Sequence, residues 1–111
     1  MVEVYLEKNS KGELTGFIVE GHAGFEEAGQ DIVCAAVSVL VQTTVLGLER
    51  ILQVEFKEFH LHSGKLICRI QDISYKEAQE KVRVLLQTME LGLQETASHY
   101  PDYVTVSYLK E

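Results

Sequence analysis

The sequence predicts an α/β fold of the α+β type, with a mixed sheet of about five strands and two helices in the order ββαββαβ. Five short segments are apolar or alternate between apolar and polar residues, and two longer segments carry apolar residues at helical spacing. Turn sequences join the first two strands and the middle two. Because 111 residues suffice for one hydrophobic core, we expect a single domain over residues 1–111.

The N-terminal part is predicted to be a β-hairpin. Apolar residues alternate with other side chains over residues 2–7, which is the period of a half-buried strand. Residues 9–12, Asn-Ser-Lys-Gly, form a turn sequence, and residues 13–20 are the second strand. A loop over residues 22–30 follows.

The first helix is predicted over residues 31–52, with Asp31 as its N-cap. Its side chains are apolar almost all round, so it lies either in the centre of the domain or against a second subunit. Residues 32–48 carry no charge, but this stretch is shorter than the roughly 20 residues that cross a bilayer. We therefore expect no membrane span.

A second hairpin is predicted from residues 54–62 and 66–71, joined by the turn at residues 63–65. Cys68 shares a face with apolar neighbours in its strand, which predicts a core residue.

The second helix is predicted to begin with a capping box, in which Ser74 is the N-cap and Glu77 reaches back to its amide. Pro101 ends the helical stretch, and residues 103–109 form the last strand. One apolar stripe follows the helix, made of Ala78, Val82, Leu85, Leu86, Met89 and Leu93.

The charge balance restricts the partners. There are 17 acidic against 10 basic residues, a net charge of −7, whereas a protein that binds nucleic acid directly needs a basic patch. An acidic surface suits a basic protein partner. Glu3 and Glu7 interrupt any secretory leader, and two distant cysteines make no disulfide framework, so we expect a cytoplasmic protein.

Cys34 and His22 are the candidate catalytic residues. Cys34 is expected at the third helical position, close to unpaired amides that favour a thiolate and can bind an oxyanion. A thiol in such a place can fall from a pKa of about 8.5 to roughly 3.5–7.5. His22 lies in the preceding loop, where it can reach the thiol as a base. The alternative interpretation is a core cysteine and an unrelated turn histidine.

Other residues are candidates for supporting or substrate-binding roles. Asp31 either caps the helix or orients His22. Ser38 lies one turn after Cys34 and can hydrogen-bond the sulfur or a substrate amide, or else its own backbone. The loop is predicted to open and close over a peptide through its glycines, Gly21, Gly24 and Gly29.

No metal or cofactor is expected. His60 and His62 share a strand face, but two histidines without a nearby cluster of cysteines or carboxylates do not make a zinc site.

The segments Gly-His-Ala-Gly at residues 21–24 and Gly-x-Asp-Ile-Val-Cys-Ala-Ala-Val-Ser at residues 29–38 resemble the signature of the ribosomal-processing cysteine protease family, Prp. This resemblance implies a small α/β fold, a homodimer, and a cytoplasmic peptidase that removes the N-terminal extension of a large-subunit ribosomal protein. It also implies that His22 is the catalytic histidine and Cys34 the nucleophile, with Asp31 at a further position of the motif.

Two functions follow as hypotheses. The first is a cysteine endopeptidase that acts on the N-terminal segment of a ribosomal protein through a Cys34–His22 dyad. The second is a non-catalytic ribosome-associated protein that binds a basic partner through its acidic surface.

Overall fold

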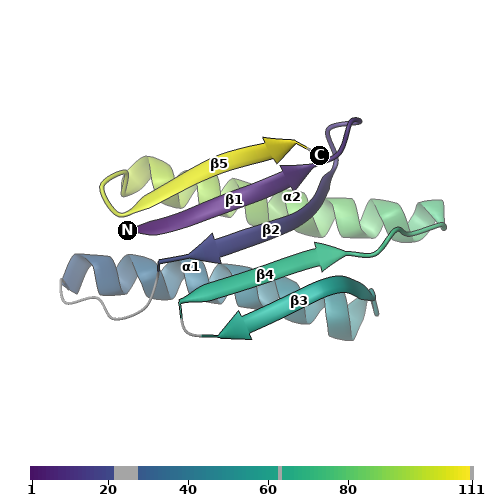
Figure 1. Ribbon diagram of the computed structural model, residues 1–111, viewed down its shortest axis with the longest axis horizontal. Coiled ribbons are helices and arrows are strands. Elements are labelled where there is room, and N and C mark those ends of the chain that lie inside the picture. Colours follow the sequence, from purple (N-terminus) through teal and green to yellow (C-terminus); the bar gives the residue numbers. More distant parts are fainter. Residues whose placement is uncertain (22–27, 63, 111) are drawn as a thin grey trace.

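The computed structural model describes the backbone of residues 1–21, 28–62 and 64–110, and their side chains other than those of residues 28–31. The elements are β1 (Val2–Lys8), β2 (Leu14–Glu20), α1 (Ala28–Leu46), the π-helical turn η1 (Gly47–Ile51), β3 (Phe56–His62), β4 (Lys65–Ile70), α2 (Lys76–His99) and β5 (Val104–Lys110). Both long helices lie behind the same face of the sheet, so the protein has two layers (Figure 1). The predicted fold class and element order are confirmed.

The sheet is mixed, with the strand order β3-β4-β2-β1-β5. The pairs β1–β2, β2–β4 and β3–β4 are antiparallel, which confirms both predicted hairpins. Strand β5 pairs in parallel with β1, and the chain reaches that edge through α2. A parallel pair needs such a long crossover, because the chain must return to the end of the sheet where the first strand began.

The hydrophobic core fills the space between the sheet and the helices. Alternate residues of β1 point into it, so Val2, Val4 and Leu6 are fully buried. Cys68 in β4 is fully buried too, as predicted. Four members of the predicted stripe on α2 complete the helical side of the core, namely Val82, Leu86, Met89 and Leu93.

Helix α1 begins at Ala28, so the prediction that Asp31 is its N-cap is wrong. Asp31 is the fourth helical residue. Gly29, assigned to the loop from its sequence, is the second. One glycine costs a helix only about 1 kcal/mol, and extending a helix that already exists gains a hydrogen bond for each residue added. An acidic residue is also favourable in the first turn, so the composition of residues 28–31 does not exclude helix.

The predicted capping box at the start of α2 is wrong. Tyr75 is the N-cap and makes no side-chain cap hydrogen bond, so Ser74 does not cap the helix. The start of α2 is tied to the preceding chain by Gln79 instead, whose side-chain amide donates to the Ile73 carbonyl and whose backbone amide donates to the Tyr75 carbonyl. This contact is different from the predicted one, because Gln79 donates to a carbonyl, whereas Glu77 was predicted to accept from the amide of the N-cap residue.

Strand β3 starts two residues later than predicted. The Val54 amide donates to the Leu48 carbonyl over 2.8 Å, which keeps this residue in the turn that leaves η1. Gln53 has a φ of 55°, a left-handed conformation that reverses the chain before the strand.

Helix α1 packs on the sheet and against α2, yet part of its outer face is apolar and exposed. Leu40 of α1 lies so close to Gly92 of α2 that an added Cβ would stand 2.7 Å from its side chain. On the outer side, Ile32 and Val39 are 67% and 66% exposed.

By length and composition alone, residues Ile32–Ile51 could cross a membrane, but the core helices of soluble proteins pass the same test. The buried face of α1 on the sheet is that of a core helix.

Candidate active site

Cys34 lies in the second turn of α1, on the face that packs against the sheet. Its side chain is 8% exposed and belongs to the core cluster together with Val37 and Val41 of the same helix. Because α1 begins at Ala28, Cys34 is the seventh helical residue and not the third. The unpaired amides of a helix belong to its first four residues, so the prediction that they surround this sulfur is wrong.

The other predicted site residues are placed only in part. Ser38 is half-buried and follows Cys34 by one turn, and residues four apart in a helix share a face. The backbone of Asp31 precedes Cys34 by about one turn of the same helix. Predicted residues His22 and Gly24 lie outside the described residues.

Gly21 fixes the point at which the chain leaves β2 toward His22. Its φ is +85°, and an added Cβ would stand 2.3 Å from the backbone oxygen of Met1. Its amide donates to the Gly64 carbonyl over 2.9 Å. This position therefore requires glycine, both for its left-handed backbone conformation and for its close contact with Met1. The residue before the candidate base is held between the start of β1 and the β3–β4 turn.

Replacing Gly21 by alanine is expected to lower the free energy of unfolding by more than the ~1–2 kcal/mol that the left-handed conformation alone costs a residue with a Cβ. The matched control is Gly12→Ala, because Gly12 has a φ of +78° with nothing within 4 Å of its added Cβ. Equilibrium urea unfolding of both variants measures the difference. Equal losses would show that the contact with Met1 contributes nothing.

Cys68 has the opposite environment from that of a reactive thiol. It is fully buried in the middle of the sheet, and burial raises the pKa of its thiol to about 12. A thiol that stays protonated at neutral pH is a poor nucleophile. This environment speaks against Cys68 as a nucleophile and leaves Cys34 as the candidate.

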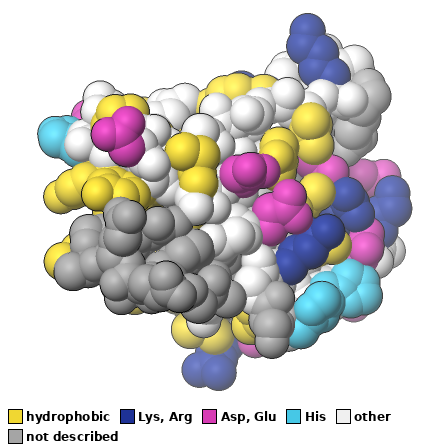
Figure 2. Space-filling view, turned by 60° about the vertical axis from the view of Figure 1, so that its left-hand side comes forward, with side chains coloured by type: hydrophobic (Ala, Val, Ile, Leu, Met, Phe, Trp, Pro, Cys, Tyr) yellow, Lys and Arg dark blue, Asp and Glu magenta, His cyan; other side chains and the backbone are white. Residues whose placement is uncertain are grey.

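The exposed face of the sheet carries paired charges. The Arg69 guanidinium contacts both Glu7 and Glu58, and these contacts raise its pKa. The His60 ring lies 3.2 Å from the Glu58 carboxylate, and Lys65 lies 3.6 Å from Glu20. Acidic, basic and histidine side chains accordingly appear together on this face (Figure 2). Within residues 1–21, 28–62 and 64–110, no three His, Cys, Asp or Glu residues are grouped for a metal ion.

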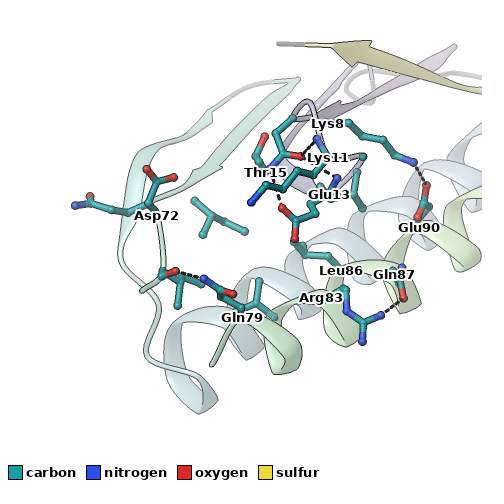
Figure 3. A pocket seen from close by; sticks show the side chains of 17 residues that line it. Lys8, Lys11, Glu13, Thr15, Asp72, Gln79, Arg83, Leu86, Gln87 and Glu90 are labelled. Carbon is teal, nitrogen blue, oxygen red and sulfur yellow. Dashed lines mark hydrogen bonds and ion pairs between the residues drawn. The ribbon is translucent and has the colours of Figure 1, made fainter. Parts of the chain in front are cut away.

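A cavity of about 500 Å³ opens at the far end of the molecule. It is lined by the β1–β2 turn, the β4–α2 connection and the first half of α2 (Figure 3). The Lys8 ammonium lies 3.7 Å from the Glu90 carboxylate on its rim, and Arg83 donates to the Gln87 side chain over 3.3 Å. Cys34 does not line this cavity, so it is separate from the thiol site.

A second, smaller hollow of about 220 Å³ lies between α1 and β3. Part of its lining comes from α1, the helix that carries Cys34. The sequence does not predict this hollow, because its lining residues lie before and after the turn that separates α1 from β3. The lining residues are Gln42, Val45, Leu46, Glu49, Phe56, Phe59, Leu61 and Leu66.

The geometry thus gives a two-layer α+β fold with one cysteine, Cys34, on its first helix and the other, Cys68, deep in its sheet. Residues 1–105 match the family model described as "Cysteine protease Prp". The chain belongs to this family and is a cysteine protease.

Known relatives agree in sequence and in fold. The chain is 31% identical to the ribosomal processing cysteine protease Prp of Staphylococcus aureus, over 97% of this chain and 99% of the relative. It is 26% identical to the protein of that name from Bacillus subtilis, over 96% of each. A crystal structure of the S. aureus protease in complex with a substrate peptide superposes with a TM-score of 0.84, at 25% identity, over 98% of this chain and 100% of that one.

Proposed function

We propose that this protein removes the N-terminal extension of a large-subunit ribosomal protein, with Cys34 as the nucleophile and His22 as the general base and acid. The observation that carries the proposal is the family match over residues 1–105, a range that includes both His22 and Cys34. The raised pKa of the Cys68 thiol supports the choice of Cys34 over that residue. The name of the relatives, ribosomal processing protease, supports the substrate class.

The reaction takes place in two halves. The Cys34 sulfur attacks the scissile carbonyl carbon while His22 accepts the thiol proton. The tetrahedral intermediate expels the new amine, which takes that proton from His22, and a thioester to Cys34 remains. His22 then deprotonates a water molecule, which attacks the thioester and returns the thiol. This sequence consumes one water for each peptide bond that is cleaved.

Asp31 and Ser38 are proposed to support this pair. Because α1 begins at Ala28, Asp31 is not the N-cap, and orienting His22 is the role that stays for it. Ser38, one turn after Cys34 on the same helix, is proposed to hydrogen-bond the sulfur or a substrate amide. Both residues act from the helix that carries the nucleophile.

Incubation with a tagged ribosomal precursor tests the proposal. The wild-type protein should release one N-terminal fragment, and the mass of the product should report a single cleaved bond. A precursor that stays at full mass, with a binding signal that weakens as salt is added, would favour the alternative of a non-catalytic protein that binds a basic partner. The net charge of −7 is the observation behind that alternative.

We further propose that the protein works in the cytoplasm as a homodimer. The two cysteines are far apart in sequence and make no disulfide framework, which fits a reducing compartment. The outer face of α1 exposes Ile32, Val39 and Leu46, an apolar surface that a second copy would cover. Sedimentation equilibrium should give twice the chain mass of 12.5 kDa. A mass of 12.5 kDa at all concentrations would contradict the dimer.

A further inference from the structure

The chain leaves β2 toward His22 at a point that the β3–β4 turn holds in place. The ladder between β2 and β4 ends at the pair Glu20 and Lys65, and one further hydrogen bond follows it, in which the Gly21 amide donates to the Gly64 carbonyl over 2.9 Å. The Lys65 ammonium lies 3.6 Å from the Glu20 carboxylate across the same two strands. Two contacts therefore hold the residues before His22 to the place where the turn enters β4.

Both glycines of this contact have a left-handed backbone. The φ angle is +85° at Gly21 and +75° at Gly64, a region in which a residue with a Cβ is strained. Because the direction of a carbonyl depends on the backbone angles of its residue, a change at Gly64 moves the acceptor of the Gly21 amide. On its other side Gly21 is closed in by the backbone oxygen of Met1, which an added Cβ would strike. Gly21 is therefore fixed from two sides, by the start of β1 and by the β3–β4 turn.

These contacts lie at the same end of the sheet as the thiol. The end of β2, the β3–β4 turn and the start of α1 are found at one end of the molecule (Figure 1). Cys34 is the seventh residue of α1, so it lies only about 9 Å along the helix axis from the first. Adjacent Cα atoms are about 3.8 Å apart, so fixing Gly21 limits the positions open to the Cα of His22. A base must come within ~2.6–3.2 Å of the thiol, and a displacement of about 1 Å can lower a rate about 10²-fold.

The geometry points to Gly64 and Lys65 as positioning residues for the general base of the reaction. Gly64 fixes the amide of Gly21, and Lys65 fixes the carboxylate of Glu20, so that the chain starts toward the thiol from one defined point. The ladder between β2 and β4 has five residue pairs before the bond at Gly64, so the sheet does not depend on that bond. This inference rests on the proposed function, since it is His22 that the two residues place.

Gly64→Ala tests the backbone contact, and Gly12→Ala is its matched control. Gly12 has a φ of +78°, close to that of Gly64, and lies in the β1–β2 turn at the opposite end of the sheet (Figure 1). Both variants place a Cβ in a left-handed backbone, so both should lower the melting temperature. Only Gly64→Ala should also lower the single-turnover rate at saturating precursor, by about 10–10²-fold, while the half-saturating precursor concentration stays the same.

Lys65→Met tests the ion pair and leaves the backbone unaltered. Its matched control is Lys81→Met, because the Lys81 ammonium also lies 3.6 Å from a carboxylate, that of Glu77 on the surface of α2. Lys65→Met should lower the single-turnover rate about twofold to fivefold, the range that an exposed ion pair can supply. Lys65→Arg and Lys81→Met should keep the wild-type rate. Exchange of the charges in the double variant Glu20→Lys, Lys65→Glu should recover most of the loss.

Two readouts separate a positioning role from a purely structural one. In the His22→Ala background, Gly64→Ala should bring no further loss of rate, because the group that Gly64 positions is already gone. With His22 present, Gly64→Ala should raise the pH midpoint of Cys34 alkylation by iodoacetamide toward about 8.5, since a displaced imidazolium no longer stabilises the thiolate. Gly12→Ala should leave this midpoint at its wild-type value.

The outcomes separate this inference from the proposed function. Equal losses of rate with and without the His22 side chain, or an unchanged alkylation midpoint in Gly64→Ala, overturn the positioning role. If Gly64→Ala does not fold, the same two readouts on Lys65→Met decide. Failure of the proposed function appears as a precursor that the wild-type protein leaves uncleaved. Alkylation needs no substrate, so in that case the midpoints still decide whether Gly64 and Lys65 act through His22.

Discussion

Replacing Cys34 by alanine is expected to abolish proteolysis, with a loss in kcat of about 10⁶-fold, the size that deletion of the nucleophile has in a well-studied hydrolase. Alanine has no group that can form the thioester, so the residual rate comes only from binding the substrate. Single-turnover cleavage of the precursor, followed by mass, measures the loss. The substitution removes one sulfur from a buried side chain, so a modest loss of stability is expected, and the melting temperature shows that the variant is still folded during the assay.

The control is Cys68→Ala. Cys68 is fully buried in β4, and its alanine variant should keep full kcat after a modest loss of stability. If Cys34→Ala protein cleaves the precursor at the wild-type rate, Cys34 is not the nucleophile. If Cys68→Ala alone loses cleavage while staying folded, the two cysteines have been assigned the wrong way round.

Replacing His22 by alanine is expected to lower kcat by about 10²–10⁴-fold, the usual contribution of a positioned general base and acid. The thiol then loses its proton acceptor, and the leaving amine loses its proton donor. The pH dependence of kcat/KM in the wild-type protein should have an acidic limb, from ionisation of the Cys34 thiol, and a basic limb, from loss of the His22 proton that the leaving amine needs. The variant should lose the basic limb.

A structural role for His22 predicts something else. In that case His22→Ala would lower the melting temperature and reduce activity only in proportion to the unfolded fraction, and the shape of the pH profile would stay the same. The control is His60→Ala, which replaces an exposed histidine of β3. The melting temperature and activity of His22→Ala are compared with those of this control.

The parts of the fold that follow from local pattern could be predicted from the sequence. Both hairpins have period-two strands and glycine-containing turns, and the apolar stripe of α2 identifies its buried face. The parallel pairing of β5 with β1 could not be predicted, because it joins the two ends of the chain through tertiary contacts alone.

The errors arise at the starts of the helices, where the capping preference of one residue competes with the rest of the structure. Asp31 and Ser74 both resemble N-caps, yet α1 begins three residues before the first and α2 two residues after the second. Capping contributes about 1 kcal/mol, and the packing of the helix on the sheet can outweigh it.

The candidate site divides in the same way. The choice of Cys34 over Cys68 follows from sequence, since only Cys68 alternates with buried strand residues. The hollow between α1 and β3 could not be predicted from the sequence, because the exposure of Leu46 and Leu61 depends on the position of β3 at the edge of the described sheet. The need for glycine at Gly21 is likewise set by Met1, which is distant in sequence.

The measurement that tests the central claim most directly is the rate at which iodoacetamide alkylates each cysteine of the folded protein as pH is varied. A catalytic Cys34 should react as a thiolate well below pH ~8, with a midpoint under the ordinary thiol pKa of about 8.5. Cys68, whose pKa burial raises to about 12, should stay unmodified until the protein unfolds. Alkylation of Cys34 that begins only near pH ~8.5, or only on unfolding, would contradict the assignment of its sulfur as the nucleophile.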